Sequence, residues 1–151
     1  MIGRKAPAFA LRDQTGRLVK LSGFRGKALV LYFYQKDFTP GCTLEARDFR
    51  KQWKVIKAAG AAVAGVSRDT VARHKQFAKA YGLPFQLLAD VDGAVCKAYK
   101  VWGKKSMYGR TFMGVIRSTF IIDRAGVVRH AIRKVKVTGH AAEVGRILGS
   151  L

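Results

Sequence analysis

Residues 28–46 read ALVLYFYQKDFTPGCTLEA, an unbroken apolar and aromatic run followed closely by the start of a helix. The run over residues 28–34 is typical of a central strand that is covered on both faces. Thr39 is a good N-cap residue, and Pro40 suits the first helical position because its missing N–H costs nothing there. We therefore expect a buried strand that leads into a helix over residues 39–59, the longest helix of the chain.

The remaining sequence alternates between strand and helix patterns on either side of this stretch. The predicted strands cover residues 9–13, 18–21, 61–66, 85–88, 118–122 and 127–132, and the predicted helices cover residues 70–81, 94–101 and 140–148. Residues 9–21 read as a hairpin with a glycine-containing turn. The order predicts an α/β fold: a central mixed sheet flanked by helices, with an N-terminal hairpin extension. No linker or repeat interrupts the pattern, so we expect one domain over residues 1–151.

Cys42 is the candidate reactive side chain in this stretch. It falls at the third helical position, where backbone N–H groups have no intrahelical acceptor and the helix dipole is positive, and both favour a thiolate. Cys42, Ala46, Phe49, Trp53 and Ile56 recur at helical spacing, so the sulfur should face the sheet. A buried cysteine often packs merely as a small apolar residue. The Thr-Pro-Gly helix start favours the alternative, an activated nucleophile.

The charge of the chain is its unusual feature. The 29 lysines and arginines outnumber the 9 acidic residues and give a formal net charge of +20, which would attract anions. The basic residues are scattered, however, and those of the first helix lie opposite its apolar stripe: Arg47, Arg50, Lys51, Lys54 and Lys57. We interpret them as a solvated face and do not expect nucleic acid as a partner. A redox-switched nucleic-acid-binding domain stays open as an alternative from another functional class.

Composition also bears on the compartment. The apolar runs are far shorter than the roughly 20 residues of a membrane-spanning helix, and the first residues carry no secretory pattern. Two cysteines 54 positions apart, Cys42 and Cys96, make neither a metal cluster nor a disulfide framework. We expect a cytoplasmic protein without a membrane partner, in a reducing setting where a cysteine is free to react.

Patterns for other active sites are missing from the sequence. It contains no Gly-x-Gly-x-x-Gly after a strand, no phosphate loop, no Gly-x-Ser-x-Gly elbow and no Cys-x-x-Cys. His74, His130 and His140 have no ligand spacing, so each is better explained as a surface or hydrogen-bonded core residue than as a metal ligand. We expect neither a cofactor nor a metal.

Two segments carry a family resemblance. Residues 32–46, YFYQKDFTPGCTLEA, follow the pattern Tyr-Phe-Tyr-Pro-Lys-Asp-x-Thr-Pro-Gly-Cys-Thr-x-Glu-Ala. Residues 107–109 (MYG) lead through Met113-Gly114 to residues 117–123 (RSTFIID). In both segments the chain resembles the peroxiredoxins, specifically the bacterioferritin comigratory protein (PrxQ-type) branch. The resemblance covers essentially the whole chain and implies a thioredoxin-like fold.

The resemblance also implies a peroxidase that reduces hydrogen peroxide and organic hydroperoxides. Cys42 would be the peroxidatic thiolate that becomes a sulfenic acid, and Thr39 would hydrogen-bond the thiolate and the peroxide. Arg117 would stabilise the thiolate and the departing charge, with Glu45 holding the arginine in place. Pro40, Gly41 and the backbone N–H groups around Cys42 would complete the peroxide cradle.

The chain departs from the family pattern at two positions. Gln35 stands where the family has a proline that shields the pocket, and Arg47 stands where many members carry a resolving cysteine. Five residues correspond to about 500° of helix, so Arg47 lies far round from Cys42. We expect a one-cysteine cycle in which an external thiol such as thioredoxin, glutaredoxin or glutathione reduces the sulfenic acid. Resolution by Cys96 stays open as the alternative, and we expect a monomer or weak dimer.

Overall fold

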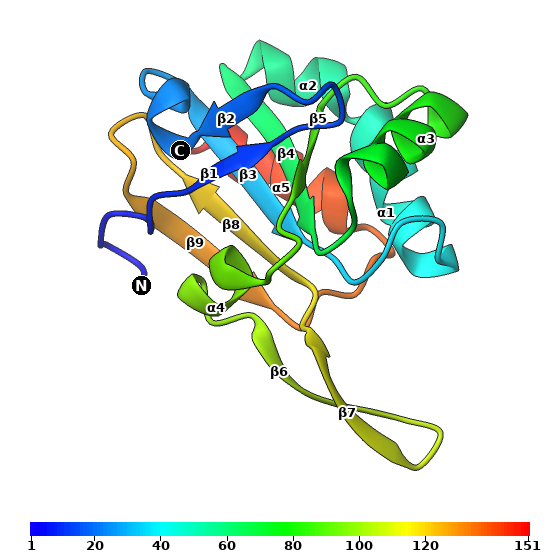
Figure 1. Cartoon of the computed structure of the whole chain (residues 1–151). Helices are drawn as coiled ribbons and strands as arrows, with labels where there is room; N and C mark the ends of the chain where they lie inside the picture. Colours follow the sequence, from blue (N-terminus) through cyan, green and yellow to red (C-terminus); the bar gives the residue numbers. More distant parts are fainter.

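A seven-stranded mixed sheet forms the centre of the molecule (Figure 1). The structure is a computed structural model that describes residues 1–151 apart from the side chain of Met107. The strands of the sheet, in spatial order, are β2 (Leu18–Lys20), β1 (Ala10–Arg12), β5 (Gln86–Ala89), β4 (Ala61–Ser67), β3 (Ala28–Phe33), β8 (Ser118–Ile122) and β9 (Val128–Arg133). The three inner strands β5, β4 and β3 are parallel, whereas the remaining pairings are antiparallel. The predicted α/β fold with an N-terminal hairpin is confirmed.

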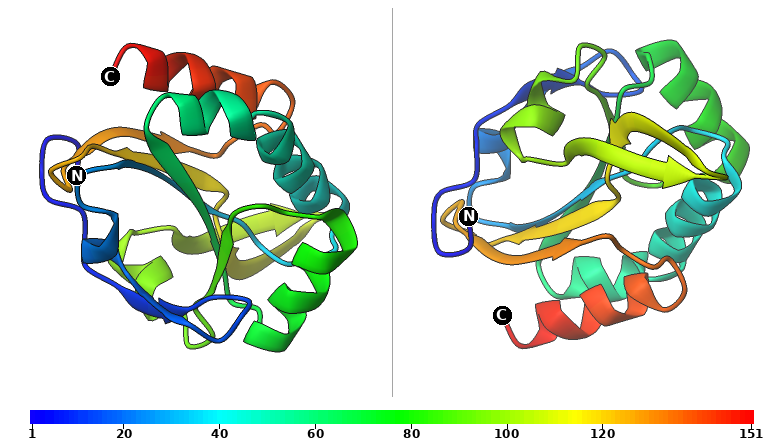
Figure 2. Two further views of the ribbon diagram at one scale, coloured as in Figure 1. Left: turned by 90° about the horizontal axis from the view of Figure 1, so that it is seen from above. Right: turned by 90° about the horizontal axis from the view of Figure 1, so that it is seen from below.

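Helices and loops cover both faces of this sheet (Figure 2). One face packs against α1 (Pro40–Lys51), α2 (Trp53–Ala58), α3 (Val71–Tyr81) and α5 (His140–Gly149). The other face packs against the N-terminal segment, the 3-10 helix η1 (Leu21–Phe24) and the short helix α4 (Ala94–Ala98). Each face therefore has a hydrophobic core of its own.

Strand β3 supplies side chains to both cores. Val30 and Tyr32 lie in the core beneath α1, whereas Leu29, Leu31 and Phe33 lie in the core beneath α4. All six residues of the strand are buried, as the continuous apolar run predicted. Burying each large side chain contributes on the order of 2 kcal/mol, so this strand anchors the whole sheet.

The sequence predicted one continuous helix over residues 39–59. This was wrong, because the structure has two helices there, α1 and α2. The α-helical geometry breaks at Gln52, whose backbone has φ −87° and ψ 0°, between α1 and α2. Helix α5 packs against the chain at this point. The side-chain oxygen of Gln52 lies 3.4 Å from the position that a Cβ on Gly145 of α5 would occupy. Neither proline nor glycine marks the break, so the sequence pattern alone gave no signal for it.

A second hairpin, missed by the sequence analysis, extends away from the main sheet (Figure 1). Strands β6 (Trp102–Met107) and β7 (Arg110–Val115) pair antiparallel as a separate two-stranded sheet. Their connection places Tyr108 at φ 51° and Gly109 at φ 74°, and two consecutive positive φ values are typical of a tight hairpin turn. Helix α4 ends at Ala98, shorter than the predicted helix over residues 94–101, and leads into this hairpin.

Candidate active site

Cys42 lies where strand β3 ends and helix α1 begins, as the sequence predicted. It is the third residue of α1, and only 2% of its surface is exposed. Ala46, Phe49 and Ile56 follow it along the buried side of α1 and α2. The sulfur therefore faces the sheet from the first turn of α1.

Arg117 brings a positive charge directly to this sulfur. It lies between β7 and β8, 75 residues from Cys42 in sequence, and its Nη2 donates a hydrogen bond to Cys42 Sγ at 3.3 Å. Its Nη1 donates to Glu45 Oε1 at 2.6 Å. The guanidinium thus holds two acceptors at once, an arrangement that its planar fork of donors suits well. Burial lowers the pKa of Arg117, but Glu45 and Cys42 raise it by more, so Arg117 stays charged.

Glu45 is the buried support of Arg117. It lies one turn along α1 from Cys42, and 1% of its surface is exposed. Burial raises the pKa of Glu45 to about 7, although Arg117 acts in the opposite direction. The carboxyl group is therefore poised between its neutral and ionised forms near neutral pH.

The residues at the start of α1 shape the space beside the sulfur. Pro40 occupies the first turn, and a Cβ on Gly41 would lie 3.1 Å from Arg117 Nη2. Glycine is thus what allows the guanidinium to approach the helix start. Thr39 is the N-cap by position, but its hydroxyl donates to the Lys36 carbonyl at 2.7 Å and not to the helix. The sequence predicted Thr39 as an N-cap residue, but its side chain makes no capping hydrogen bond to the helix. The lone pairs of its hydroxyl oxygen remain available to accept a hydrogen bond.

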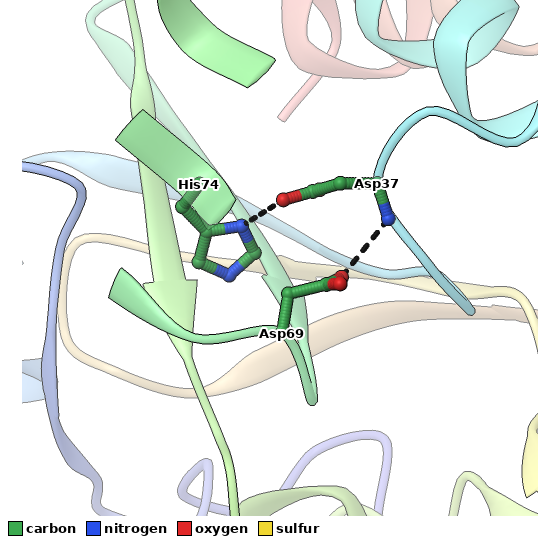
Figure 3. A group of neighbouring side chains, drawn as sticks. All are labelled: Asp37, Asp69 and His74. Atoms are coloured by element: carbon green, nitrogen blue, oxygen red, sulfur yellow. Dashed lines mark hydrogen bonds and ion pairs between the residues drawn. The ribbon is translucent and has the colours of Figure 1, made fainter. Parts of the chain in front are cut away.

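A buried polar group holds the loop between β3 and Cys42 (Figure 3). His74 Nδ1 lies 2.6 Å from Asp37 Oδ2, and its Nε2 lies 3.1 Å from the Leu88 carbonyl. Because a carbonyl only accepts, Nε2 must carry a proton, and a second proton lies between Nδ1 and Asp37. Tyr34 donates to the other oxygen of Asp37, whose backbone N–H donates to Asp69.

Asp37, Asp69 and His74 are also close enough together to bind a metal ion, within 4.8 Å of one another. The hydrogen bonds already engage both ring nitrogens of His74 and both carboxylate oxygens of Asp37. We therefore interpret the group as a clamp that fixes the loop before Cys42 to α3 and β5. His140, the other buried histidine of the described chain, bonds Thr119 at 2.7 Å, whereas His130 is exposed.

Cys96 lies on the opposite face of the sheet from Cys42. It is fully buried in the core beneath α4, whereas Cys42 belongs to the core beneath α1. Its backbone N–H donates to Asp90 Oδ2 at 2.8 Å. Burial, reinforced by Asp90, raises the pKa of the Cys96 thiol. The structure does not bring Cys96 to the Cys42 site.

The two positions that depart from the family pattern have distinct surroundings. Arg47 is exposed on α1. Gln35 Oε1 accepts a hydrogen bond at 2.7 Å from Lys105 Nζ, on the hairpin that the sequence analysis missed. Lys105, like the pairing of Asp37 with His74, had no signal in the sequence, because these contacts join segments far apart in the chain.

The arrangement provides a buried sulfur nucleophile in the first turn of a helix, with a fixed cation against it. Such a site can attack a small electrophile and stabilise negative charge that develops on a departing atom.

No helix in the described chain has both the length and the apolar character required to cross a bilayer.

Comparisons with known proteins agree with this chemistry. Residues 2–131 match the AhpC/TSA family. Peroxiredoxin Bcp of Bacillus subtilis is 46% identical over 142 residues, covering 94% of this chain and 90% of the relative. Peroxiredoxin Q of Xanthomonas campestris superposes with a TM-score of 0.89 at 43% identity, covering 94% and 90% of the two chains. A bacterioferritin comigratory protein from the same organism, studied for its alkyl peroxide reduction, gives a TM-score of 0.92 at 40% identity, covering 99% and 98%.

Proposed function

This chain belongs to the AhpC/TSA family, as a peroxiredoxin of the Bcp/PrxQ type, and we propose that Cys42 is the residue that carries its chemistry. It is a thiol-dependent peroxidase, an enzyme that reduces hydroperoxides with electrons from a thiol. The contact of Arg117 Nη2 with Cys42 Sγ is the single observation that carries the assignment, because it pairs a nucleophile with a fixed cation. Residues 1–151 act together as one domain in this proposal.

The reaction begins with the Cys42 thiolate, which the first-turn N–H groups of α1 and the Arg117 guanidinium favour. The sulfur attacks the hydroxyl oxygen of HO–OR, the one that carries hydrogen, and the S–O bond forms as the O–O bond breaks. Cys42 is oxidised to a sulfenic acid, and RO⁻ leaves and takes up a proton to become ROH. Hydrogen peroxide and organic hydroperoxides share this bond. The alkyl peroxide reduction of the Xanthomonas neighbour supports the organic substrates.

The remaining site residues orient the peroxide and the cation. Thr39 has lone pairs free to accept from the peroxide, since its own proton goes to the Lys36 carbonyl. Gly41 leaves room for Arg117, and Pro40 fixes the first turn whose N–H groups face the substrate. Glu45 holds the guanidinium in place, so that stabilisation of the departing charge costs little reorganisation.

The catalytic cycle needs one cysteine in this proposal. A disulfide requires α-carbons within roughly 7 Å, and Cys42 and Cys96 lie in cores on opposite faces of the sheet. The thiol of Cys96 is also buried, with a raised pKa that disfavours its attack on a sulfenic acid. An external thiol such as thioredoxin, glutaredoxin or glutathione therefore reduces Cys42 directly. We further propose a cytoplasmic monomer or weak dimer, in which both cysteines stay free.

The test compares the two cysteines. Peroxide treatment of the wild type should give a dimedone adduct at Cys42, and Cys42→Ser should abolish turnover. Cys96→Ser should keep steady-state turnover with an external thiol. A stoichiometric Cys42–Cys96 disulfide that forms as fast as peroxide is consumed, together with inactive Cys96→Ser, would replace the one-cysteine cycle by a two-cysteine cycle.

A further inference from the structure

The ammonium group of Lys105 bridges the two segments that carry the reactive side chains. It donates to Gln35 Oε1 at 2.7 Å and to the Val115 carbonyl at 3.0 Å. Gln35 begins the loop that leads to Cys42, and Val115 ends the strand that leads to Arg117. A lysine ammonium has three donors, so one N–H remains after these two bonds.

Lys105 lies in the electrostatic environment of the site, although it belongs to the projecting hairpin. Its side chain is half-buried, and both Arg117 and Cys42 act on its charge. Burial first, and then Arg117, lowers the pKa of Lys105, while Cys42 opposes the change. The ammonium therefore gives up a proton more readily than an exposed lysine does.

The peroxidase reaction requires a proton that the residues around the sulfur do not readily supply. The departing RO⁻ is a strong base and becomes ROH only when it is protonated. Arg117 does not release protons in proteins. Glu45 bonds Nη1 of Arg117 whereas Cys42 bonds Nη2, so the guanidinium lies between Glu45 and the reacting sulfur.

We propose that Lys105 is a further catalytic residue of this peroxidase, which donates its proton to the oxygen that leaves. As the Cys42 sulfur forms its bond to the first peroxide oxygen and the O–O bond breaks, the free N–H of Lys105 protonates the second oxygen. The products are the Cys42 sulfenic acid, ROH and neutral Lys105, which regains its proton from water. Gln35 and Val115 position the ammonium for this transfer. The inference rests on Cys42 being the peroxidatic residue.

Two substrates that differ in their leaving group provide the test. Tert-butyl hydroperoxide releases a strongly basic alkoxide that needs a proton, whereas peracetic acid releases acetate, a weak base that does not. The full-length reduced protein is mixed rapidly with each substrate, quenched with dimedone, and the Cys42 adduct is measured by mass spectrometry over time. Thermal melting verifies that each variant is folded.

Lys105→Met should slow oxidation by tert-butyl hydroperoxide about tenfold or more, within the usual range for general acids, but slow oxidation by peracetic acid less than about threefold. Lys105→Arg keeps the charge but holds its protons too tightly, so it should resemble Lys105→Met with the hydroperoxide. Gln35→Leu removes an anchor of the ammonium and should give an intermediate, hydroperoxide-selective loss. The matched control Lys104→Met changes an exposed neighbour on the same strand and should react like the wild type.

Three results would overturn the inference: full rescue by Lys105→Arg, equal slowing with both substrates, or no slowing in Lys105→Met. Rescue by arginine would assign Lys105 a charge effect only. Failure of the Cys42 assignment gives a different result, because the wild type itself would then form no dimedone adduct at Cys42 with either substrate.

Discussion

The contact between Arg117 and Cys42 can be tested by replacing the arginine with lysine. Arg117 donates through Nη1 to Glu45 and through Nη2 to the Cys42 sulfur, at 2.6 and 3.3 Å. A lysine keeps the positive charge, but its single nitrogen does not reproduce the planar fork that reaches both acceptors. Arg117→Lys therefore removes one charged hydrogen bond while it retains the net charge.

The magnitude follows from this lost bond. A hydrogen bond to a charged group contributes about 1.5–3 kcal/mol, and each 1.4 kcal/mol of transition-state stabilisation is about tenfold in rate. Oxidation of Cys42 in Arg117→Lys should thus slow about tenfold to a hundredfold. The effect on folding should be smaller, because a lysine still neutralises Glu45 and burial already raises the pKa of that carboxyl to about 7. We expect the melting temperature to fall by no more than about 4 °C.

Rapid mixing of the reduced protein with hydrogen peroxide, followed by dimedone trapping, measures the rate directly. Arg146→Lys is the matched control, because Arg146 is exposed on α5 and should react like the wild type. An unchanged rate in Arg117→Lys would remove Arg117 from the chemistry. A slow rate accompanied by a large loss of melting temperature would assign it to the fold instead.

Three further changes test the surroundings of this pair. The raised pKa of Glu45 means that the folded state binds its proton more tightly than the unfolded chain. The free energy of unfolding from this group is therefore fully present below about pH 4.5 and is lost, by up to about 3 kcal/mol, as the pH rises through about 7. Glu45→Gln should abolish this dependence in denaturant titrations at several pH values. Gly41→Ala forces a Cβ to 3.1 Å from Arg117 Nη2, and should slow Cys42 oxidation severalfold in the dimedone assay without unfolding the protein. His74→Leu removes the histidine that pairs with the buried Asp37 carboxylate and should lower the free energy of unfolding in urea by about 3–5 kcal/mol, whereas a loss under about 1 kcal/mol would contradict the clamp.

Periodicity predicted the parts of this fold that depend on local sequence. The continuous apolar run over residues 28–34 and the stripe from Cys42 to Ile56 correspond to a buried strand and to a helix face against the sheet. The hairpin β6–β7 was missed, because its strands carry the exposed Lys104 and Arg110 and form a sheet separate from the main one. The break at Gln52 depends on where α5 packs, which no local pattern encodes.

In the active site too, features that depend on local sequence were predicted, whereas contacts between distant segments were not predicted from the sequence pattern. The position of Cys42 at a helix start followed from Thr39 and Pro40, since helix capping is a local property. The approach of Arg117, 75 residues away, was expected only from the family resemblance. The Lys105 contact and the Asp37–His74 clamp were not expected at all, because each joins distant segments through side chains of common types.

The structure also explains where the net charge of +20 resides. Seven of the nine acidic side chains accept hydrogen bonds within the fold: Asp13, Asp37, Glu45, Asp69, Asp90, Asp92 and Asp123. The acidic residues thus lie mainly where a turn, a helix start or a buried cation needs an acceptor, while most of the basic residues lie on the surface. A field of this kind attracts any anion without selecting one. Selectivity must therefore arise at the Cys42 site, where Glu45 holds the Arg117 guanidinium in place against the sulfur.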